Sequence, residues 1–216
     1  MRTLVVNTFI SLDGVMQAPG GPHEDPTGGF THGGWGVNYF DDEMMAQMAE
    51  AAPYELLLGR GTYEIFAAHW PYTDGAIADR LNSTVKHVAS TTLEQAEWSN
   101  SILITGDVAE YVAALKSQDG PEIQVHGSPG LIQTLLEHDL IDEYRIWIFP
   151  LVIGAGKRFF GGGAAPAALN LIESKVSRTG VTINTYRRAG EINLGSFEFD
   201  EPTEKEIERR RRLAAA

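Results

Sequence analysis

The sequence predicts an α/β protein, and three observations support this prediction. Short apolar, β-branched segments alternate with helical patterns along most of the chain, and the last predicted elements are two strands with no helix between them. A hydrophobic content of 43% supports a packed core, and 216 residues fit one large domain better than two small ones. This order is typical of a sandwich whose mostly parallel sheet gains antiparallel strands near its C-terminus.

The N-terminal third predicts a strand, a long loop and a helix. Residues 4–10 form an apolar, β-branched segment that ends in a turn sequence at 11–14. Residues 14–36 contain eight glycines and three prolines, a composition that predicts a long loop of the kind that serves as a lid or a binding loop. An amphipathic helix begins at the acidic residues 41–43 and ends before Pro53.

Two strand-turn-helix units dominate the middle of the chain. A strand over 54–58 leads through residues 59–62 into one helix, and a strand over 123–126 leads through the turn 127–130 into a helix over 131–138. The remaining elements predicted between and after these units are a helix over 77–83, strands over 85–89 and 101–104, a helix capped by Asp107 that reaches about residue 116, a strand over 143–149, a loop over 150–160, and a hairpin of strands 169–176 and 181–186.

The last segment, residues 191–216, is predicted to be an extension beyond a single domain over 1–190. Glu206 with Arg210, and Glu208 with Arg212, have the i,i+4 spacing of helical ion pairs. A charge run of this kind is typical of a solvated helix or tail, and we assign it no function.

Composition excludes several classes of function. With 17 Lys and Arg against 29 Asp and Glu, the net charge is −12, which argues against a general nucleic-acid-binding protein because such proteins need a basic face. Cysteine is absent, so disulfides, thiolate metal sites and cysteine nucleophiles are excluded. The start of the sequence lacks a secretory signal, and no apolar run approaches the roughly 20 residues of a membrane helix, so we expect a soluble cytoplasmic protein.

The two strand-turn-helix junctions are candidates for phosphate binding. Free N–H groups and the helix dipole favour an anion at a helix N-terminus, and glycines let the backbone approach it closely. Arg60 adds a guanidinium at the first junction. The alternative interpretation is that both are ordinary turns in which Thr62 and Ser128 serve as N-caps. The glycines of the two junctions are Gly59, Gly61, Gly127 and Gly130.

Better-known motifs do not match. Residues 154–157 lack the first glycine and the Ser/Thr of a P-loop, and residues 59–64 lack the last glycine of the dinucleotide fingerprint. Ser128 resembles the serine of a nucleophile elbow, but Pro129 removes the N–H that would complete an oxyanion hole, so a serine hydrolase is only a distant alternative. The six histidines include no metal-binding pair, so we expect no metal.

Four segments in this order resemble the dihydrofolate-reductase-like proteins, and most closely the C-terminal reductase domain of the bifunctional riboflavin-biosynthesis deaminase-reductase. The segments are residues 11–14, 57–64, 126–128 and 140–160, within a resemblance over about 2–188. The resemblance implies a three-layer αβα sandwich around a mostly parallel eight-stranded sheet, with NADPH across the strand ends.

The same resemblance implies a set of cofactor-binding residues. Arg60 would favour NADPH over NADH, Gly14 would lie beside the nicotinamide together with Asp13, and the loop 14–36 would close over it as a lid. The residues implied for the phosphates are Gly59, Arg60 and Thr62, those for the pyrophosphate are Gly127, Ser128, Gly130 and Leu131, and those for the adenosine end are Ser90 and Thr91.

On the substrate side, the implied catalytic carboxylates are Asp13 and Glu43, with Asp42 beside Glu43 on the first helix. Their alternative interpretation is structural, because acidic residues complement the dipole in a first helical turn. The implied reaction is hydride transfer to a small heterocycle or sugar carbonyl, such as a folate, a pterin or a ribosylaminopyrimidine whose phosphate Lys157 or Arg158 would hold. The alternative function is a nucleotide- or flavin-binding module without turnover.

For partners, we expect a small-molecule substrate, no nucleic acid and no membrane. A homodimer is expected from the resemblance and from apolar strand segments such as residues 146–149.

Overall fold

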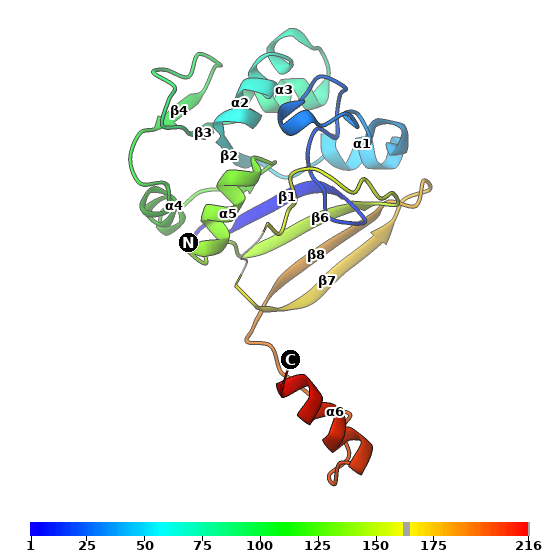
Figure 1. Cartoon of the computed structure of the whole chain (residues 1–216). Coiled ribbons are helices and arrows are strands. Elements are labelled where there is room, and N and C mark those ends of the chain that lie inside the picture. The colour runs from blue at the N-terminus through cyan, green and yellow to red at the C-terminus, as the bar shows by residue number, and fades with distance from the viewer. Residues whose placement is uncertain (162–164, 216) are drawn as a thin grey trace.

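The computed structural model describes residues 1–161 and 165–215. Within them the chain forms a mostly parallel sheet (Figure 1). Its strands are β1 (Leu4–Ser11), β2 (Tyr54–Gly59), β3 (Lys86–Ala89), β4 (Ser101–Ile104), β5 (Glu122–Val125), β6 (Glu143–Phe149), β7 (Ala168–Val176) and β8 (Thr182–Gly190). The eight strands lie in the order β4-β3-β2-β5-β1-β6-β8-β7. Only the β6–β8 and β8–β7 pairs are antiparallel, so the predicted sheet is confirmed.

Helices cover both faces of the sheet, which confirms the three layers. They are α1 (Asp42–Ala49), α2 (Arg60–Ala67), α3 (Ala76–Ser83), α4 (Val108–Ser117) and α5 (Pro129–Glu137). Because side chains of a strand alternate between faces, Leu57 of β2 packs in one core cluster with α4 and α5, whereas Leu56 and Leu58 pack in another with Tyr63 of α2 and Leu81 of α3. The two clusters fix α2 and α5 on opposite faces.

The larger differences between predicted and observed element boundaries have simple reasons. Helix α5 begins at Pro129, earlier than the expected residue 131, because proline fits the first helical position, where its missing N–H costs nothing. Strand β8 runs on to Gly190 because it pairs with β7 over most of its length. Helix α1 ends where Arg80 of α3 donates to the carbonyl oxygens of Ala49 (2.9 Å) and Ala51.

An aromatic cluster lies under the antiparallel half of the sheet. Phe149 of β6 is fully buried and stacks edge-on with Phe9, Trp35 and Tyr39, and Met44 of α1 packs in the same cluster. This packing fixes α1 and the end of the long loop on the sheet. It also places Trp147 and Phe149 of the segment that suggested a dimer inside the domain, with 3% and 0% exposure.

The loop over residues 14–36 is predicted correctly as irregular, apart from the short 3-10 turn η1 (Thr27–Gly29). The Trp35 indole donates to the carbonyl of Gln17 (2.7 Å), and the Gln17 amide donates to the carbonyls of Asp25 (3.0 Å) and Thr27 (2.9 Å). A Cβ at Gly33 would lie 2.5 Å from the carbonyl oxygen of Gly21, so these glycines permit the loop to fold on itself. Two further 3-10 turns are η2 (Val37–Tyr39) and η3 (Trp70–Tyr72).

Beyond β8 the chain leaves the sheet and ends in helix α6 (Glu204–Ala214), which lies apart from it in Figure 1. The expected Glu206–Arg210 pair forms at 2.8 Å, and Glu206 also binds Arg209. Across the described part of the chain, the expected Glu208–Arg212 pair is absent. No described helix is long and apolar enough to span a membrane.

Candidate functional site

The carboxyl ends of β2 and β5 lie side by side, and the chain turns from them toward opposite faces of the sheet. Strand β2 pairs in parallel with β5, and the helices that follow, α2 and α5, cover different faces. A crevice outside the strand ends at such a switch point is the usual ligand site of an open α/β sheet. The two junctions that the sequence marks as candidates therefore meet at one place.

A hydrogen-bonded contact locks the two junctions together. Ser128 lies within hydrogen-bond distance of the Thr62 hydroxyl (2.7 Å) and the Gly59 carbonyl oxygen (3.1 Å), and its hydroxyl donates there. A Cβ at Gly59 would lie 2.6 Å from the Ser128 Cβ, so only glycine permits this approach. Gly127 (φ +131°) and Ser128 (φ +68°) adopt left-handed conformations that aim the turn at Thr62.

The interpretation of Thr62 as a capping residue is wrong, whereas Ser128 does occupy the N-cap position of α5 but makes no capping hydrogen bond with its side chain. Gly59 is the N-cap of α2, and neither α2 nor α5 has a side-chain cap, because the Ser128 hydroxyl is bonded across the junction instead. By contrast, Asp41 caps α1 by accepting from the Met44 N–H (2.9 Å), and Asp107 caps α4 as predicted. Two uncapped helix N-termini, each aimed at the same crevice, fit a phosphate or pyrophosphate.

The other expected cofactor residues flank this junction. Arg60 is half exposed and forms a weak pair with Glu64 (3.4 Å), so it is available to an anion. Ser90 follows β3, whose Ala89 pairs in register with Gly59, and its hydroxyl accepts from the N–H groups of Thr92 and Leu93. Three more expected residues are the exposed Thr91, the exposed Gly130 and Leu131, whose side chain is buried in the core.

Asp13 ties two loops together. Its carboxylate accepts from the Ser11 hydroxyl (2.6 Å) and from the N–H groups of Ile153 (3.0 Å) and Gly154 (2.9 Å). The Ser11 hydroxyl, followed by the Ile153 N–H, lowers the pKa of Asp13 well below its usual range. The carboxylate therefore stays ionised. Gly14, which follows it at φ +84°, accepts at its carbonyl from the Phe159 N–H.

Asp42 and Glu43 lie exposed in the first turn of α1. A cavity of about 990 Å³ lies between α1, α2, the long loop and the sheet, and neither side chain lines it. Helix α1 contributes Met45, Gln47 and Met48 to the lining. At one end the cavity reaches Thr62, Gly127 and Ser128, so it opens directly onto the two helix N-termini.

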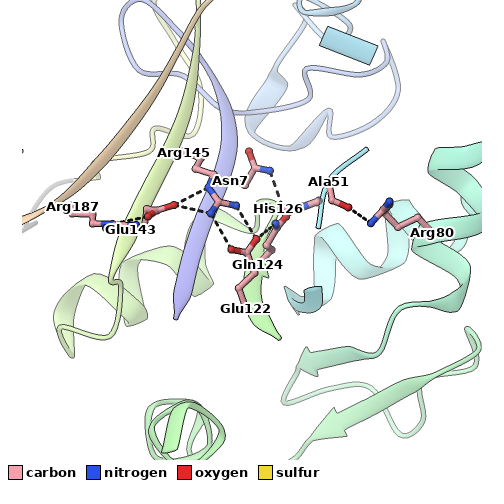
Figure 2. A network of polar contacts seen from close by, with 9 residues as sticks. All are labelled: Asn7, Ala51, Arg80, Glu122, Gln124, His126, Glu143, Arg145 and Arg187. Carbon is pink, nitrogen blue, oxygen red and sulfur yellow. Dashed lines mark hydrogen bonds and ion pairs between the residues drawn. The ribbon is translucent and has the colours of Figure 1, made fainter. Parts of the chain in front are cut away.

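The floor of the cavity carries a chain of polar side chains that the sequence did not predict as a site (Figure 2). Arg145 of β6 binds both oxygens of Glu122 on β5 (2.8 and 2.9 Å), Gln124 contacts Glu122, and Nε2 of His126 contacts the Gln124 oxygen (2.6 Å). Burial lowers the pKa of His126 to about 4, so its imidazole is neutral.

The same floor continues across the sheet. Glu143 of β6 accepts from Arg145 (2.8 Å) and from Arg187 of β8 (2.8 Å), and the Asn7 amide of β1 reaches Gln124 at 3.5 Å. A signal for this floor does exist in the sequence: Glu122, Gln124 and His126 alternate along a strand and so share a face. Their partners on β6 and β8 depend on strand register, which no local pattern reports.

The cations of the late loop are already paired within the domain. Lys157 forms an ion pair with Asp25 of the long loop (2.6 Å), and Arg158 binds Asp13 (3.4 Å) and its carbonyl oxygen. Neither residue lines the cavity. In residues 1–161 and 165–215, no group of His, Asp and Glu side chains has the arrangement of a metal site.

Comparison with known proteins agrees with this architecture. The family model described as the RibD C-terminal domain matches residues 2–183. The Bacillus subtilis (strain 168) "Uncharacterized protein YyaP" is 25% identical over 198 residues, which is 88% of this chain and 96% of that protein. The crystal structure of a putative riboflavin biosynthesis protein from Shewanella sp. PV-4 is 25% identical, has a TM-score of 0.61, and is matched over 86% of this chain and 98% of that one.

A more distant likeness shows the fold alone. Dihydrofolate reductase from Enterococcus faecalis, in a structure described as complexed with NADP(H) and RAB-propyl, is 14% identical with a TM-score of 0.56 over 87% of this chain and 96% of that one. With the family match spanning most of the sequence, the fold and the comparisons agree: the chain belongs to the RibD C-terminal domain family, within the dihydrofolate-reductase-like fold.

Proposed function

We propose that the protein is an NADPH-dependent reductase that transfers a hydride to a small heterocycle or a sugar carbonyl. The observation that carries this proposal is the meeting of two helix N-termini without side-chain caps at Gly59 and Ser128, beside a large cavity whose lining includes Ser128. Free N–H groups there suit the pyrophosphate of a dinucleotide. The fold that this chain shares with an NADP(H)-bound reductase gives the proposal further support.

The residues present fit such a cofactor. Gly59 has no room for a side chain, Gly127 and Ser128 expose backbone at left-handed φ angles, and the Arg60 guanidinium is only weakly paired. In the proposal Arg60 and Thr62 hold one side of the phosphates, the 127–131 turn holds the pyrophosphate, and Ser90 and Thr91 lie at the adenosine end. NADPH would supply the hydride, and the chain would bind it, orient it and exclude water.

The cavity and its covering loop suit the exclusion of water. Phe9, Met48, Phe66 and Trp147 contribute apolar surface, and the loop 14–36 covers one side. We assign Asp13 a positioning role, because its ionised carboxylate holds the loop after β1 to the loop after β6. Asp42 and Glu43 lie outside the cavity, so we route no proton through them.

A carboxylate for proton delivery is present on the covering loop instead. Glu24 lines the cavity, and burial raises its pKa against the opposing effect of the Gly20 and Gly21 N–H groups, which donate to its carboxylate. A carboxyl group whose pKa is raised is better suited to act as a general acid than one with an ordinary pKa. We therefore propose Glu24 as the proton donor. Glu24→Gln should abolish most turnover while NADPH affinity stays within about threefold of the wild type.

The alternative is a nucleotide- or flavin-binding module without turnover. One observation favours it: on the described cavity floor, both carboxylates, Glu122 and Glu143, are already paired with arginines and so are not free to serve a substrate. Tight cofactor binding with no substrate-dependent oxidation of NADPH, over a panel of pterins and ribosylaminopyrimidines, would select this alternative.

The cofactor proposal is tested by titration with NADPH and NADH, read by tryptophan fluorescence. We expect NADPH to bind more tightly than NADH, and Arg60→Ala to remove about tenfold of NADPH affinity because a charge-assisted phosphate contact is lost. Arg211→Ala, which removes a positive charge on α6, serves as the matched control. Absence of binding by both nucleotides would contradict the proposal.

We also propose a homodimer, now on different grounds from those of the sequence. The edge strand β7 exposes Leu171, Ile172 and Val176, and the extension exposes Phe197 and Phe199. Apolar surface on an unpaired edge strand is a common site of association. Light scattering at micromolar concentration should give twice the chain mass of 23.6 kDa, and a monomer mass would contradict the proposal.

A further inference from the structure

The polar chain on the cavity floor fixes which nitrogen of His126 carries a hydrogen. Arg145 holds both oxygens of Glu122, and a carboxylate can only accept hydrogen bonds (Figure 2). Gln124 must therefore turn its amide nitrogen toward Glu122, which leaves its carbonyl oxygen facing Nε2 of His126 at 2.6 Å. Because that oxygen is an acceptor, Nε2 is the protonated nitrogen.

The other ring nitrogen is then a free acceptor. His126 lines the cavity and is half-buried, and within the described residues no hydrogen bond reaches its Nδ1. The ring stays neutral near pH 7 because its pKa is lowered to about 4 by burial, against the attraction of Glu122. The Tyr54 ring lies 5.5 Å away and provides an aromatic wall beside it. A ligand at this point meets one fixed acceptor and an aromatic surface.

The cations on the lining leave no partner for a phosphate at the same place. Among the described lining residues, each of the three cations is already paired with a carboxylate. Arg145 forms ion pairs with Glu122 and Glu143, and Arg187 forms one with Glu143. Lys175 forms an ion pair with Glu173 of β7 at 3.0 Å. A phosphate on the substrate would therefore find no unpaired cation among these lining residues.

We propose that the cavity floor recognises an uncharged, non-phosphorylated ring compound that donates an N–H or O–H hydrogen bond to Nδ1 of His126. This inference rests on the proposed function, which makes the cavity a substrate site. His126 directly precedes Gly127, where the cofactor pyrophosphate is proposed to bind, and both residues line the cavity. A ring held there lies beside the position assigned to the cofactor. The substrate would then differ from the phosphorylated ribosylaminopyrimidine that the family resemblance suggests.

The test compares matched ligands that differ only in a phosphate. Equilibrium dialysis of the full chain, with saturating NADP⁺, would measure riboflavin against riboflavin 5′-phosphate and uridine against uridine 5′-phosphate. We expect the uncharged member to bind at least tenfold more tightly in each pair that binds. Equal or tighter binding of the phosphorylated members, or no binding of riboflavin and uridine at millimolar concentration, would overturn the inference.

Variants test the role of the imidazole. His126→Leu should cost about tenfold in affinity for the uncharged ligand, because one neutral hydrogen bond is lost. His126→Gln, whose amide oxygen can accept, should restore most of it. His138→Leu changes an exposed histidine at the end of α5 and should have no effect. Unchanged binding in His126→Leu would overturn the assignment, and the wild-type ligand pairs stand as a test that needs no variant.

Failure of the proposed function gives a different result. Repeating the dialysis without NADP⁺ separates the two outcomes. If NADP⁺ does not bind, the reductase proposal fails, but the ligand pairs still show whether the uncharged member is preferred. The variant Glu173→Gln provides a third measurement, because it leaves Lys175, on the half-exposed side of the cavity, without its ion-pair partner. It should reduce the difference in affinity between riboflavin and riboflavin 5′-phosphate.

Discussion

Helix N-termini in this protein fall into two kinds. Helices α1 and α4 begin with an aspartate that accepts from a first-turn N–H, whereas α2 and α5 begin without a side-chain cap and meet across the Ser128–Thr62 contact. Helix α3 also lacks a cap, but it begins at Gly75 in an exposed turn. In the proposed function, this difference separates the helix ends that the chain satisfies itself from those whose N–H groups bind the cofactor phosphates.

The largest effect is expected from a substitution that blocks the close contact between the two junctions. Gly59→Ala places a Cβ 2.6 Å from that of Ser128, so the strand ends must separate. We expect a loss of about 1–3 kcal/mol in the free energy of unfolding and more than tenfold in NADPH affinity. Urea denaturation and fluorescence titration measure the two quantities.

Gly61→Ala is the matched control for this variant. A Cβ at Gly61 meets nothing within 4 Å, and the residue lies inside α2, where alanine is favoured over glycine by about 1 kcal/mol. Its stability should therefore rise or stay unchanged. Equal NADPH affinity in the two alanine variants would show that the close contact between Gly59 and Ser128 is not needed for cofactor binding.

Much of the fold was predictable from local pattern, because its strands are short β-branched segments bounded by turn residues. Strands β4 and β6 begin and end at the predicted residues. The close contact at Gly59 was not predictable, since it joins residues 69 positions apart. Sequence placed glycines at both junctions, and only the strand order shows that β2 and β5 are neighbours.

The site was predicted less completely on the substrate side than on the cofactor side. Gly59, Thr62, Gly127 and Ser128 carry a local signal, a glycine-rich turn before a helix, and the structure brings them together. The acidic residues at the start of α1 carry a signal for a helix N-terminus, which is satisfied by the helix dipole without a ligand. The orientation of His126 depends, through Glu122 and Gln124, on Arg145 of a neighbouring strand, so the sequence alone could not assign it.

Removing a cap should have a smaller effect, and only on stability. Asp107→Ala deletes the acceptor for the Glu110 N–H (2.8 Å), with an expected cost of about 1 kcal/mol and unchanged NADPH affinity. Ser128→Ala deletes no cap and should instead weaken NADPH binding through the loosened contact with Thr62. Reduced cofactor binding in Asp107→Ala would show that the two kinds of N-terminus are not functionally distinct.

The smallest effect concerns Asp13 and depends on pH. Its pKa is held below the usual 3.8, so the carboxylate contributes stability above about pH 4 and loses it as the pH falls and the group protonates. Asp13→Asn should be less stable than the wild type at pH 7 by about 0.5 kcal/mol. Thermal unfolding at several pH values should show this difference shrinking below pH 4, and a constant difference would contradict the role of the ionised carboxylate.

The most direct test of the central claim is the response of individual backbone amides to NADPH in ¹⁵N-labelled protein. We predict large chemical-shift changes at Gly61, Thr62 and Leu131, the first-turn amides of α2 and α5, with little change at Ala109 and Glu110 in the capped first turn of α4. Shifts confined to other regions, or equal shifts at the capped and uncapped helix ends, would contradict the claim that the paired junctions bind the cofactor.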